Sequence, residues 1–190
     1  MARPRNFDEE RAVEAAMHAF WIAGFEATST QDLCEATGLG RSSIYNTFKS
    51  KRDLFERALR HYMELTAASY TELLEGPGTA KEKLAELFRR AIEDESRDGL
   101  GCLVVNTGIE LAPRDPRIAE LLARDHRRRL EVLRATVRAG QLDGEIDPDR
   151  DPSDVAQFVI ATIGGIRVAA RSGQGREALE AVARTALRAI

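Results

Sequence analysis

Apolar residues recur at helical spacing along almost the whole chain, and no stretch of several residues alternates apolar and polar side chains with a period of two. Steps of three and four residues place apolar side chains on one face of an α-helix, whereas a half-buried strand needs alternation. The pattern therefore predicts an all-α fold of about nine helices and gives little support for strands.

Glycines and hydroxyl side chains divide the first third of the chain into four expected helices. The first is expected to begin at Asp8, as N-cap, and to end at Gly24, because glycine readily adopts the left-handed backbone that closes a helix. Ser50 and Asp53 have the spacing of a capping box, which predicts the start of the fourth. The four expected helices are residues 8–24, 31–37, 42–48 and one that begins near residue 51.

The strongest break in the chain is Gly76-Pro77-Gly78, and a second helical unit follows it. Thr79 can cap the first helix of that unit. The later expected helices are residues 102–111, 116–139, 153–172 and 175–190. We assign residues 1–53 to an N-terminal domain and residues 54–190 to a C-terminal domain.

Length and composition are typical of a soluble globular protein, with 190 residues, 43% of them hydrophobic and 31% charged. The longest uncharged run, Val155 to Ile166, is twelve residues, which is short of the ~18 that span a bilayer. We expect a cytoplasmic protein. Cys34 and Cys102 lie 68 positions apart without metal-type spacing, so we expect reduced thiols, no metal and no cofactor.

The net charge of −3 argues against a general nucleic-acid binder, but it conceals a local asymmetry. Residues 38–60 contain six basic and two acidic side chains, a local charge of +4 on an acidic protein. A positive segment of this kind can contact phosphates.

Residues 30–48 predict a helix-turn-helix, because two short helices surround a glycine-containing turn. Gly38 can reverse the chain direction, and Cys34 is small enough to sit where the helices cross. Lys51, beside the cap of the next helix, suits a phosphate oxygen. The second helix would present short polar side chains to a major groove, namely Arg41, Ser42, Ser43, Tyr45, Asn46 and Thr47.

The segments around this motif closely resemble the N-terminal domain of the TetR family of bacterial repressors. They are residues 24–29, Gly38-Leu39, residues 44–48 and residues 49–54. The resemblance implies a homodimer that binds a palindromic operator and is released by a small ligand in the C-terminal domain. It also implies that the positions of Thr30, Gln31, Arg41, Ser42, Ser43, Tyr45, Thr47 and Lys51 face DNA, with Tyr45 and Lys51 on phosphates. Gln31 stands where several relatives carry a cation, so it contacts a base edge or nothing.

Three further features of the sequence have two interpretations each. Arg3 and Arg5 form either a minor-groove arm or, as we favour, a frayed tail. Tyr45 either packs its ring with the hydroxyl in solvent or contacts a phosphate, and we favour the phosphate. The arginines between residues 124 and 138 are interleaved with acids, so we favour a solvated face over a second nucleic-acid patch.

Four residues of the C-terminal domain are candidates for an effector pocket: Cys102, Asn106, Glu110 and His126. His126 lies on the apolar stripe of its helix, so a satisfied core histidine is the default interpretation. Asn106 and Glu110 are polar groups in a mostly apolar segment. Cys102 starts a helix, where the dipole lowers a thiol pKa, and it resembles the cysteine with which some family members sense electrophiles or oxidants. For Cys102 we favour an inert buried thiol, and Cys34 is assigned to packing alone.

The last two expected helices form a candidate dimer interface, because they carry apolar stripes around the Gly164-Gly165 pair. Packing within one chain is the alternative, and the family resemblance favours a four-helix bundle across a two-fold axis. The candidate interface residues are Phe158, Ile163, Gly164, Gly165, Ile166, Leu179, Val182 and Ala186.

These observations predict a ligand-responsive DNA-binding transcriptional regulator, a repressor rather than an enzyme. The expected partners are an operator duplex, a second copy of the chain and an unidentified small effector. One alternative is a DNA-binding protein without ligand control. The other is a thiol enzyme that uses Cys102 with His126, which lacks an orienting third group.

Overall fold

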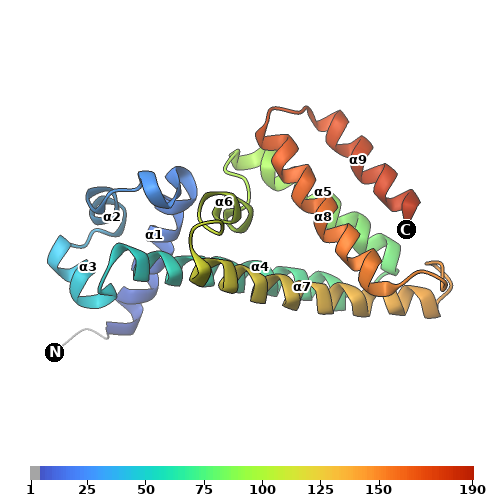
Figure 1. Cartoon of the computed structure of the whole chain (residues 1–190), viewed down its shortest axis with the longest axis horizontal. Coiled ribbons are helices and arrows are strands. Elements are labelled where there is room, and N and C mark those ends of the chain that lie inside the picture. The colour runs from blue at the N-terminus through green and yellow to red at the C-terminus, as the bar shows by residue number, and fades with distance from the viewer. Residues whose placement is uncertain (1–4) are drawn as a thin grey trace.

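The computed structural model describes residues 5–190, with side chains over residues 9–94 and 99–190, and confirms the all-α fold. Within that range there are nine α-helices and no strand (Figure 1). The helices are α1 (Arg5–Ala27), α2 (Thr30–Thr37), α3 (Arg41–Phe48), α4 (Lys51–Glu75), α5 (Ala80–Asp98), α6 (Leu103–Glu110), α7 (Pro116–Leu142), α8 (Pro152–Arg171) and α9 (Arg176–Ala189).

The start of α1 differs from the prediction. The helix already includes Arg5, so Asp8 lies inside it and is not its N-cap. The sequence between Arg5 and Asp8 contains neither proline nor glycine, so no helix breaker stops α1 at the expected cap. The frayed tail expected at Arg5 is likewise wrong, because that residue is helical, and Arg3 lies outside the described residues.

The predicted break at Gly24 is confirmed. Its backbone has φ 82° and ψ 173°, and one further helical turn continues from there to Ala27. The hydroxyl of Thr28 donates to the Gly24 carbonyl at 2.6 Å, which satisfies an acceptor that the interrupted helix leaves free. Residues 25–27 thus form a short helical turn between Gly24 and the start of α2.

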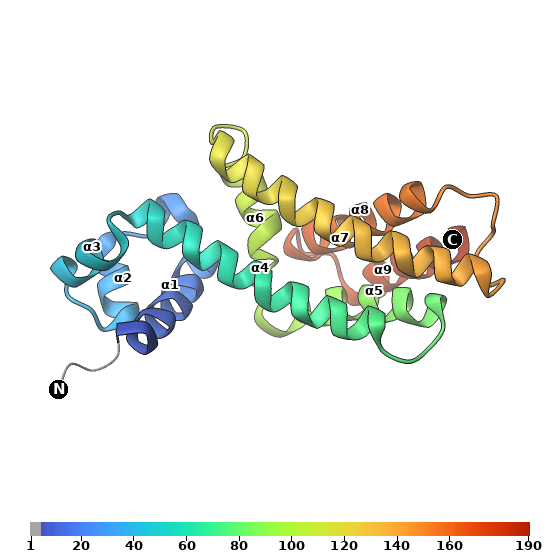
Figure 2. The same ribbon diagram turned by 90° about the horizontal axis from the view of Figure 1, so that it is seen from below.

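Helices α1 to α3 pack around the first half of α4, and α4 then continues into the rest of the molecule beside α7 (Figures 1 and 2). A first core surrounds Phe20, Phe48 and Phe55, all at most 1% exposed. It extends without interruption to Leu103 and Leu111, at the two ends of α6. Helix α6 thus shares its apolar core with the N-terminal helices.

The second core lies among α5, α7, α8 and α9, around Phe88, Leu133 and Val159. Helix α8 is long and apolar enough to cross a membrane by length and composition alone, but it packs here on α5, α7 and α9. Only a third of its most apolar window is buried, so part of its apolar surface faces outward.

Candidate functional site

Helix α2 begins with a complete capping box. The backbone N–H of Asp32 donates to the Ser29 hydroxyl at 3.1 Å, and the Ser29 N–H donates to the Asp32 carboxylate at 2.7 Å. The backbone and side-chain hydrogen bonds from Ser29 hold the pKa of Asp32 below its ordinary value of 3.8. Two amide donors at the helix start are thereby satisfied, which fixes where α2 begins.

The turn and packing predicted for the helix-turn-helix are both confirmed. Gly38 closes α2 with φ 68° and ψ 14°, the left-handed conformation that glycine adopts without a Cβ penalty. Leu33, Ile44 and Phe48 are at most 1% exposed and fill the space between the helices. Cys34 is half-buried against the same core, as its packing assignment predicted.

The outward face of α3 is polar and open to solvent. The six side chains predicted to face DNA from this helix, Arg41, Ser42, Ser43, Tyr45, Asn46 and Thr47, are all exposed. Of the predicted residues on α2, Gln31 is also exposed, while Thr30 is half-buried. A row of short polar side chains on a protruding helix is the arrangement with which proteins contact base edges in a major groove.

Tyr45 connects this face to the start of α2. Its hydroxyl lies 3.3 Å from that of Thr30, and the guanidinium of Arg41 lies 5.9 Å from the ring centroid. The hydrogen bond with Thr30, followed by that with Arg41, lowers the pKa of Tyr45 from its usual value. The phenol therefore stands among hydrogen-bond donors at the edge of the polar face.

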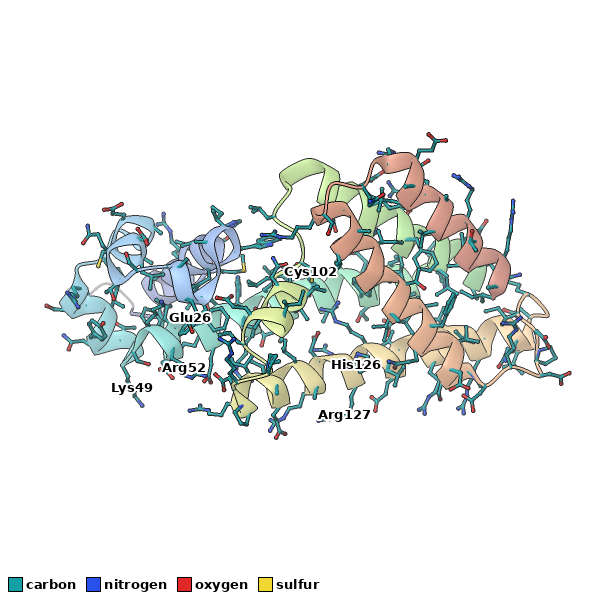
Figure 3. All side chains as sticks on the ribbon, turned by 45° about the horizontal axis from the view of Figure 1, so that its top comes forward. Glu26, Lys49, Arg52, Cys102, His126 and Arg127 are labelled. Carbon is teal, nitrogen blue, oxygen red and sulfur yellow. The ribbon has the colours of Figure 1, made fainter. Side chains whose placement is uncertain are left out.

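Lys51 lies at the far edge of the helix-turn-helix, beside the short turn that follows Gly24. Its ammonium is 3.4 Å from the Glu26 carbonyl and 4.6 Å from the centre of the Phe25 ring. Lys49 was not among the predicted DNA-binding residues, but its side chain is exposed between α3 and α4 (Figure 3). Its position directly after the second short helix is the sequence signal that could have identified it.

The four candidates for an effector pocket divide between two cavities. Cys102 and His126 line one cavity, where α4, α6, α7 and α8 meet. Asn106 and Glu110 line another, where α6 faces the end of α1. A helix of eight residues presents several faces, and the sequence spacing alone did not separate them.

Cys102 is 3% exposed and lies beside Tyr62. The Tyr62 hydroxyl donates to its Sγ at 3.7 Å, and burial raises the pKa of that tyrosine. The Trp21 indole N–H donates to the Gly101 carbonyl at 2.8 Å, and its ring meets that of Tyr62 edge-on at 4.9 Å. The start of α6 is thus joined to both α1 and α4.

His126 is half-buried and differs from a core histidine. Its Nε2 lies 3.1 Å from Oε1 of Gln157 on α8. Five arginines of α7 lie exposed on the solvated face that was expected: Arg124, Arg127, Arg128, Arg134 and Arg138. Arg129 departs from that expectation, because it points inward and donates from Nε to the Asp125 carboxylate at 2.7 Å.

The candidate dimer residues occupy two environments. Ile163, Ile166, Leu179 and Ala186 are at most 5% exposed and pack in the protomer's own core. The apolar stripe of a helix marks its buried face, and the expected interface included residues from that stripe. Four candidates face outward in whole or part, namely Phe158, Gly164, Gly165 and Val182.

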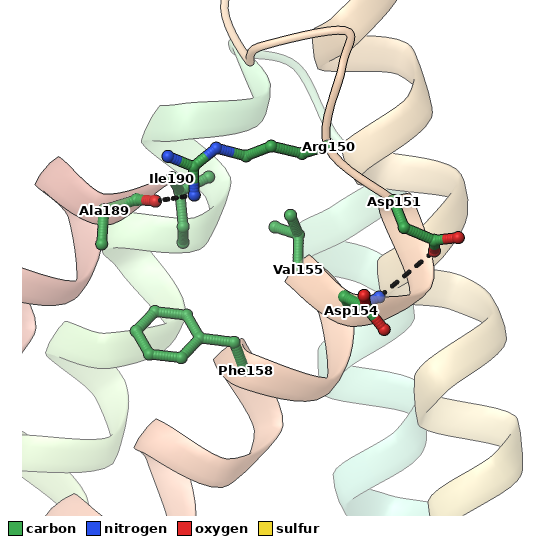
Figure 4. Close-up of a pocket in the computed structure, with 7 residues that line it drawn as sticks. All are labelled: Arg150, Asp151, Asp154, Val155, Phe158, Ala189 and Ile190. Atoms are coloured by element: carbon green, nitrogen blue, oxygen red, sulfur yellow. Dashed lines mark hydrogen bonds between the residues drawn. The ribbon is translucent and has the colours of Figure 1, made fainter.

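These outward residues belong to an apolar surface on α8 and α9. Phe158 is 43%, Val168 44% and Val182 46% exposed. A Cβ added at Gly165 would meet no atom within 4 Å, so this chain alone gives no close approach that explains the glycine. A hollow of about 380 Å³ lies at one end of this surface, between Phe158 and the C-terminal residue Ile190 (Figure 4).

Two family models match the chain. Residues 12–58 match the bacterial regulatory proteins of the tetR family, and residues 78–186 match the tetracyclin repressor-like C-terminal domain. A protruding helix-turn-helix on a helical C-terminal unit defines a DNA-binding transcriptional regulator. The chain belongs to the TetR family.

Curated relatives and solved structures agree with this. The transcriptional repressor ComR of Escherichia coli (strain K12) is 35% identical over 98% of this chain and 90% of its own length. The regulator YezE of Bacillus subtilis (strain 168) is 35% identical over 84% of each chain. A cysteine mutant of the TetR-family regulator CifR, solved with a 26-base-pair operator duplex, has 33% identity and a TM-score of 0.86 over 99% of each chain.

Proposed function

We propose that this protein is a homodimeric repressor that binds a palindromic operator through α3 and releases it when a small effector binds in the C-terminal domain. The observation that carries the proposal is the polar outward face of α3, held by a buried core at most 1% exposed. ComR is named a repressor, and CifR was solved on operator DNA, which supports the same activity here.

Within this proposal the residues have distinct parts. Ser42, Ser43, Asn46 and Thr47 read base edges, and Arg41 and Gln31 flank them. The hydroxyls of Tyr45 and Thr30 and the ammonium of Lys51 hold phosphates, and Lys49 joins them because it is exposed at the same edge. These contacts would position the helix in the groove, while the short polar side chains would give sequence preference.

Dimerisation is proposed through the outward surface of α8 and α9. Phe158, Gly165 and Val182 would pack against their counterparts across a two-fold axis. An isologous interface presents two identical α3 helices, and a palindrome mirrors that symmetry. Residues 1–53 are the proposed DNA-binding domain and residues 54–190 the proposed ligand-binding and dimerisation domain.

Effector response is proposed to act through α6, which contacts α1 of the N-terminal domain and α4 and α7 of the C-terminal domain. A ligand that displaces α6 would move α1 and change the separation of the two recognition helices from the groove spacing of about 34–36 Å or a multiple of it. No catalytic activity is proposed, and a regulator that binds the bacterial chromosome is expected to act in the cytoplasm.

Selection of bound fragments from random genomic DNA tests the proposal. We expect the purified protein to enrich fragments that share an inverted repeat, and sedimentation of the complex to give an even number of protomers per site. Fragments without a shared repeat would contradict the repressor assignment. Specific binding that no compound in a broad metabolite panel weakens would favour a DNA-binding protein without ligand control.

A further inference from the structure

The cavity beside Cys102 has the dimensions of a small-molecule site. Its volume is about 180 Å³, and Val105, Leu122 and Ile160 give it apolar walls. Cys102 and His126, labelled in Figure 3, reach it from α6 and α7. An apolar cavity of about 150 Å³ is known to hold one benzene molecule. The cavity beside Cys102 therefore accommodates a ligand about the size of one six-membered ring with a small polar group.

Arg167 of α8 lines the same cavity and is only 9% exposed. No hydrogen bond or ion pair joins its guanidinium to any residue in the described part of the chain, and none of its nitrogens is both unpartnered and fully enclosed by protein. Buried arginines are normally paired, because an isolated charge inside a protein is strongly unfavourable. Arg167 thus presents five N–H donors and a positive charge to the cavity without a protein acceptor.

The other charges at the cavity cancel one another. The Asp125 carboxylate accepts from Nε of Arg129 at 2.7 Å, and Nη2 of Arg129 donates to the Thr66 hydroxyl at 3.1 Å. These two residues form a neutral pair at the cavity wall. Asp94 on α5 is exposed and makes no ion pair with Arg167 within 4.0 Å. Among the described residues that line the cavity, one uncompensated positive charge remains.

The protonation state of Arg167 supports this count. Burial acts to lower the pKa of its guanidinium, whereas Cys102, Tyr70, Tyr62 and Asp94 raise it, and the net shift is upward. The group therefore stays charged near neutral pH.

We infer that the effector is a small organic monoanion, most simply a monocarboxylate with a short apolar or aromatic body, whose charged group binds Arg167. A planar carboxylate matches the fork of a guanidinium with two parallel hydrogen bonds. A single negative charge on the ligand would neutralise the positive charge of Arg167, whereas a dianion would leave one negative charge buried without a partner. This inference rests on the effector response proposed above and assigns the chemical class of the effector.

Calorimetric titration of the full-length protein tests the class with matched probes. Benzoate and hexanoate serve as monoanions, benzamide as the neutral analogue, and terephthalate as a dianion. We expect at least one monoanion to bind with a Kd below about 1 mM and benzamide to bind at least about tenfold more weakly. Equal binding of benzoate and benzamide, or no binding by either monoanion, would overturn the inference.

Substitution of Arg167 provides the second arm. In Arg167→Gln we expect monoanion affinity to fall at least about tenfold, while Arg167→Lys retains part of it. The control, Arg134→Gln, removes an exposed charge on α7 and should leave affinity unchanged. Unchanged affinity in Arg167→Gln would overturn the inference.

A third arm compares thermal unfolding with and without ligand. If Arg167 is an unpaired buried charge, replacement by the similarly sized Met should leave Tm equal or raise it without ligand and abolish the rise in Tm that benzoate gives the parent protein. A lower Tm for Arg167→Met, or failure to fold, would show a structural partner for the guanidinium and contradict the inference.

The experiment also separates this inference from the proposed function. Monoanion binding that depends on Arg167 but does not release DNA from the selected fragments would sustain the site and contradict the effector response. DNA release by a neutral metabolite, with no monoanion bound, would sustain the repressor and contradict the site.

Discussion

The carboxylate of Glu110, at the end of α6, accepts a hydrogen bond from the backbone N–H of Phe25, with 3.1 Å between Oε2 and N. Its other oxygen accepts from the N–H of Glu26 at 2.8 Å. A carboxylate from the C-terminal half of the chain thus caps the short helical turn after Gly24, which leads into α2. A side chain that lines a candidate effector pocket thus also joins the two halves of the molecule.

Glu110→Ala should lower the free energy of unfolding by about 2 kcal/mol, because it removes a charged acceptor and leaves two amides without a partner. Urea denaturation measures the change. Glu120→Ala is the matched control, since Glu120 forms an exposed i,i+4 pair with Arg124 that contributes about 0–1 kcal/mol. Equal midpoints for the two variants would show that the link at Glu110 contributes nothing to stability.

Gly38→Ala should destabilise the protein by about 1–2 kcal/mol through backbone strain, because φ is 68° and no atom lies within 4 Å of an added Cβ. Gly38→Asn is the matched variant, because asparagine tolerates the left-handed region better. Thermal unfolding should rank glycine above asparagine and asparagine above alanine. The same Tm for alanine and glycine would contradict the strain.

Lys51→Ala should weaken binding to the selected fragments and to random DNA by the same factor. It should also reduce the slope of log K against log salt by roughly one phosphate contact. Asn46→Ala should weaken only the specific complex, because its contact is to a base. Lys81→Ala, on α5, is the charge-matched control. An unchanged salt slope in Lys51→Ala would remove this lysine from the interface.

Gly165→Arg should convert the dimer to a monomer that remains folded. The protomer has open space at this position, and arginine is a better helix former than glycine. The substitution should therefore weaken only the contact with the partner protomer and leave the fold stable. Sedimentation velocity measures the change in mass, and circular dichroism checks the fold. Leu142→Arg, at a residue 89% exposed at the end of α7, should remain dimeric. A dimeric Gly165→Arg protein would place the interface elsewhere.

Asp32 should titrate below 3.8 because the hydrogen bonds from Ser29 favour its charged form. A lowered pKa in the folded state gives stability that is present above the unfolded value of 3.8 and is lost as pH falls through the folded value. Side-chain NMR titration gives the folded pKa directly. In Asp32→Asn the loss of stability seen at neutral pH should shrink in acid. A folded pKa at or above 3.8 would contradict the capping geometry.

Much of this arrangement could be predicted because local rules determine it. The Ser29 and Ser50 caps, the reversal at Gly38 and the buried face of α3 each depend on residues within a few positions of one another. The outward direction of the polar side chains of α3 followed from the same periodicity.

Relationships between distant segments were not predictable in this way. Glu110 contacts Phe25 across 85 positions, and no periodicity indicates which face of α6 meets α1. Arg167 directly follows the uncharged run Val155 to Ile166, and a single charge on an apolar helix gives no sign of whether it has a partner. The dimer stripe was assigned partly to buried residues because apolar spacing does not distinguish a protomer's own core from an interface.

Methylation interference on a selected fragment shows whether α3 enters the major groove, because a methyl group on guanine N7 blocks the major groove alone. We expect modified guanines to inhibit binding in two patches related by two-fold symmetry, with centres about 34–36 Å or a multiple of that distance apart along the duplex. Inhibition at a single patch, or none in the major groove, would contradict a pair of α3 helices seated there.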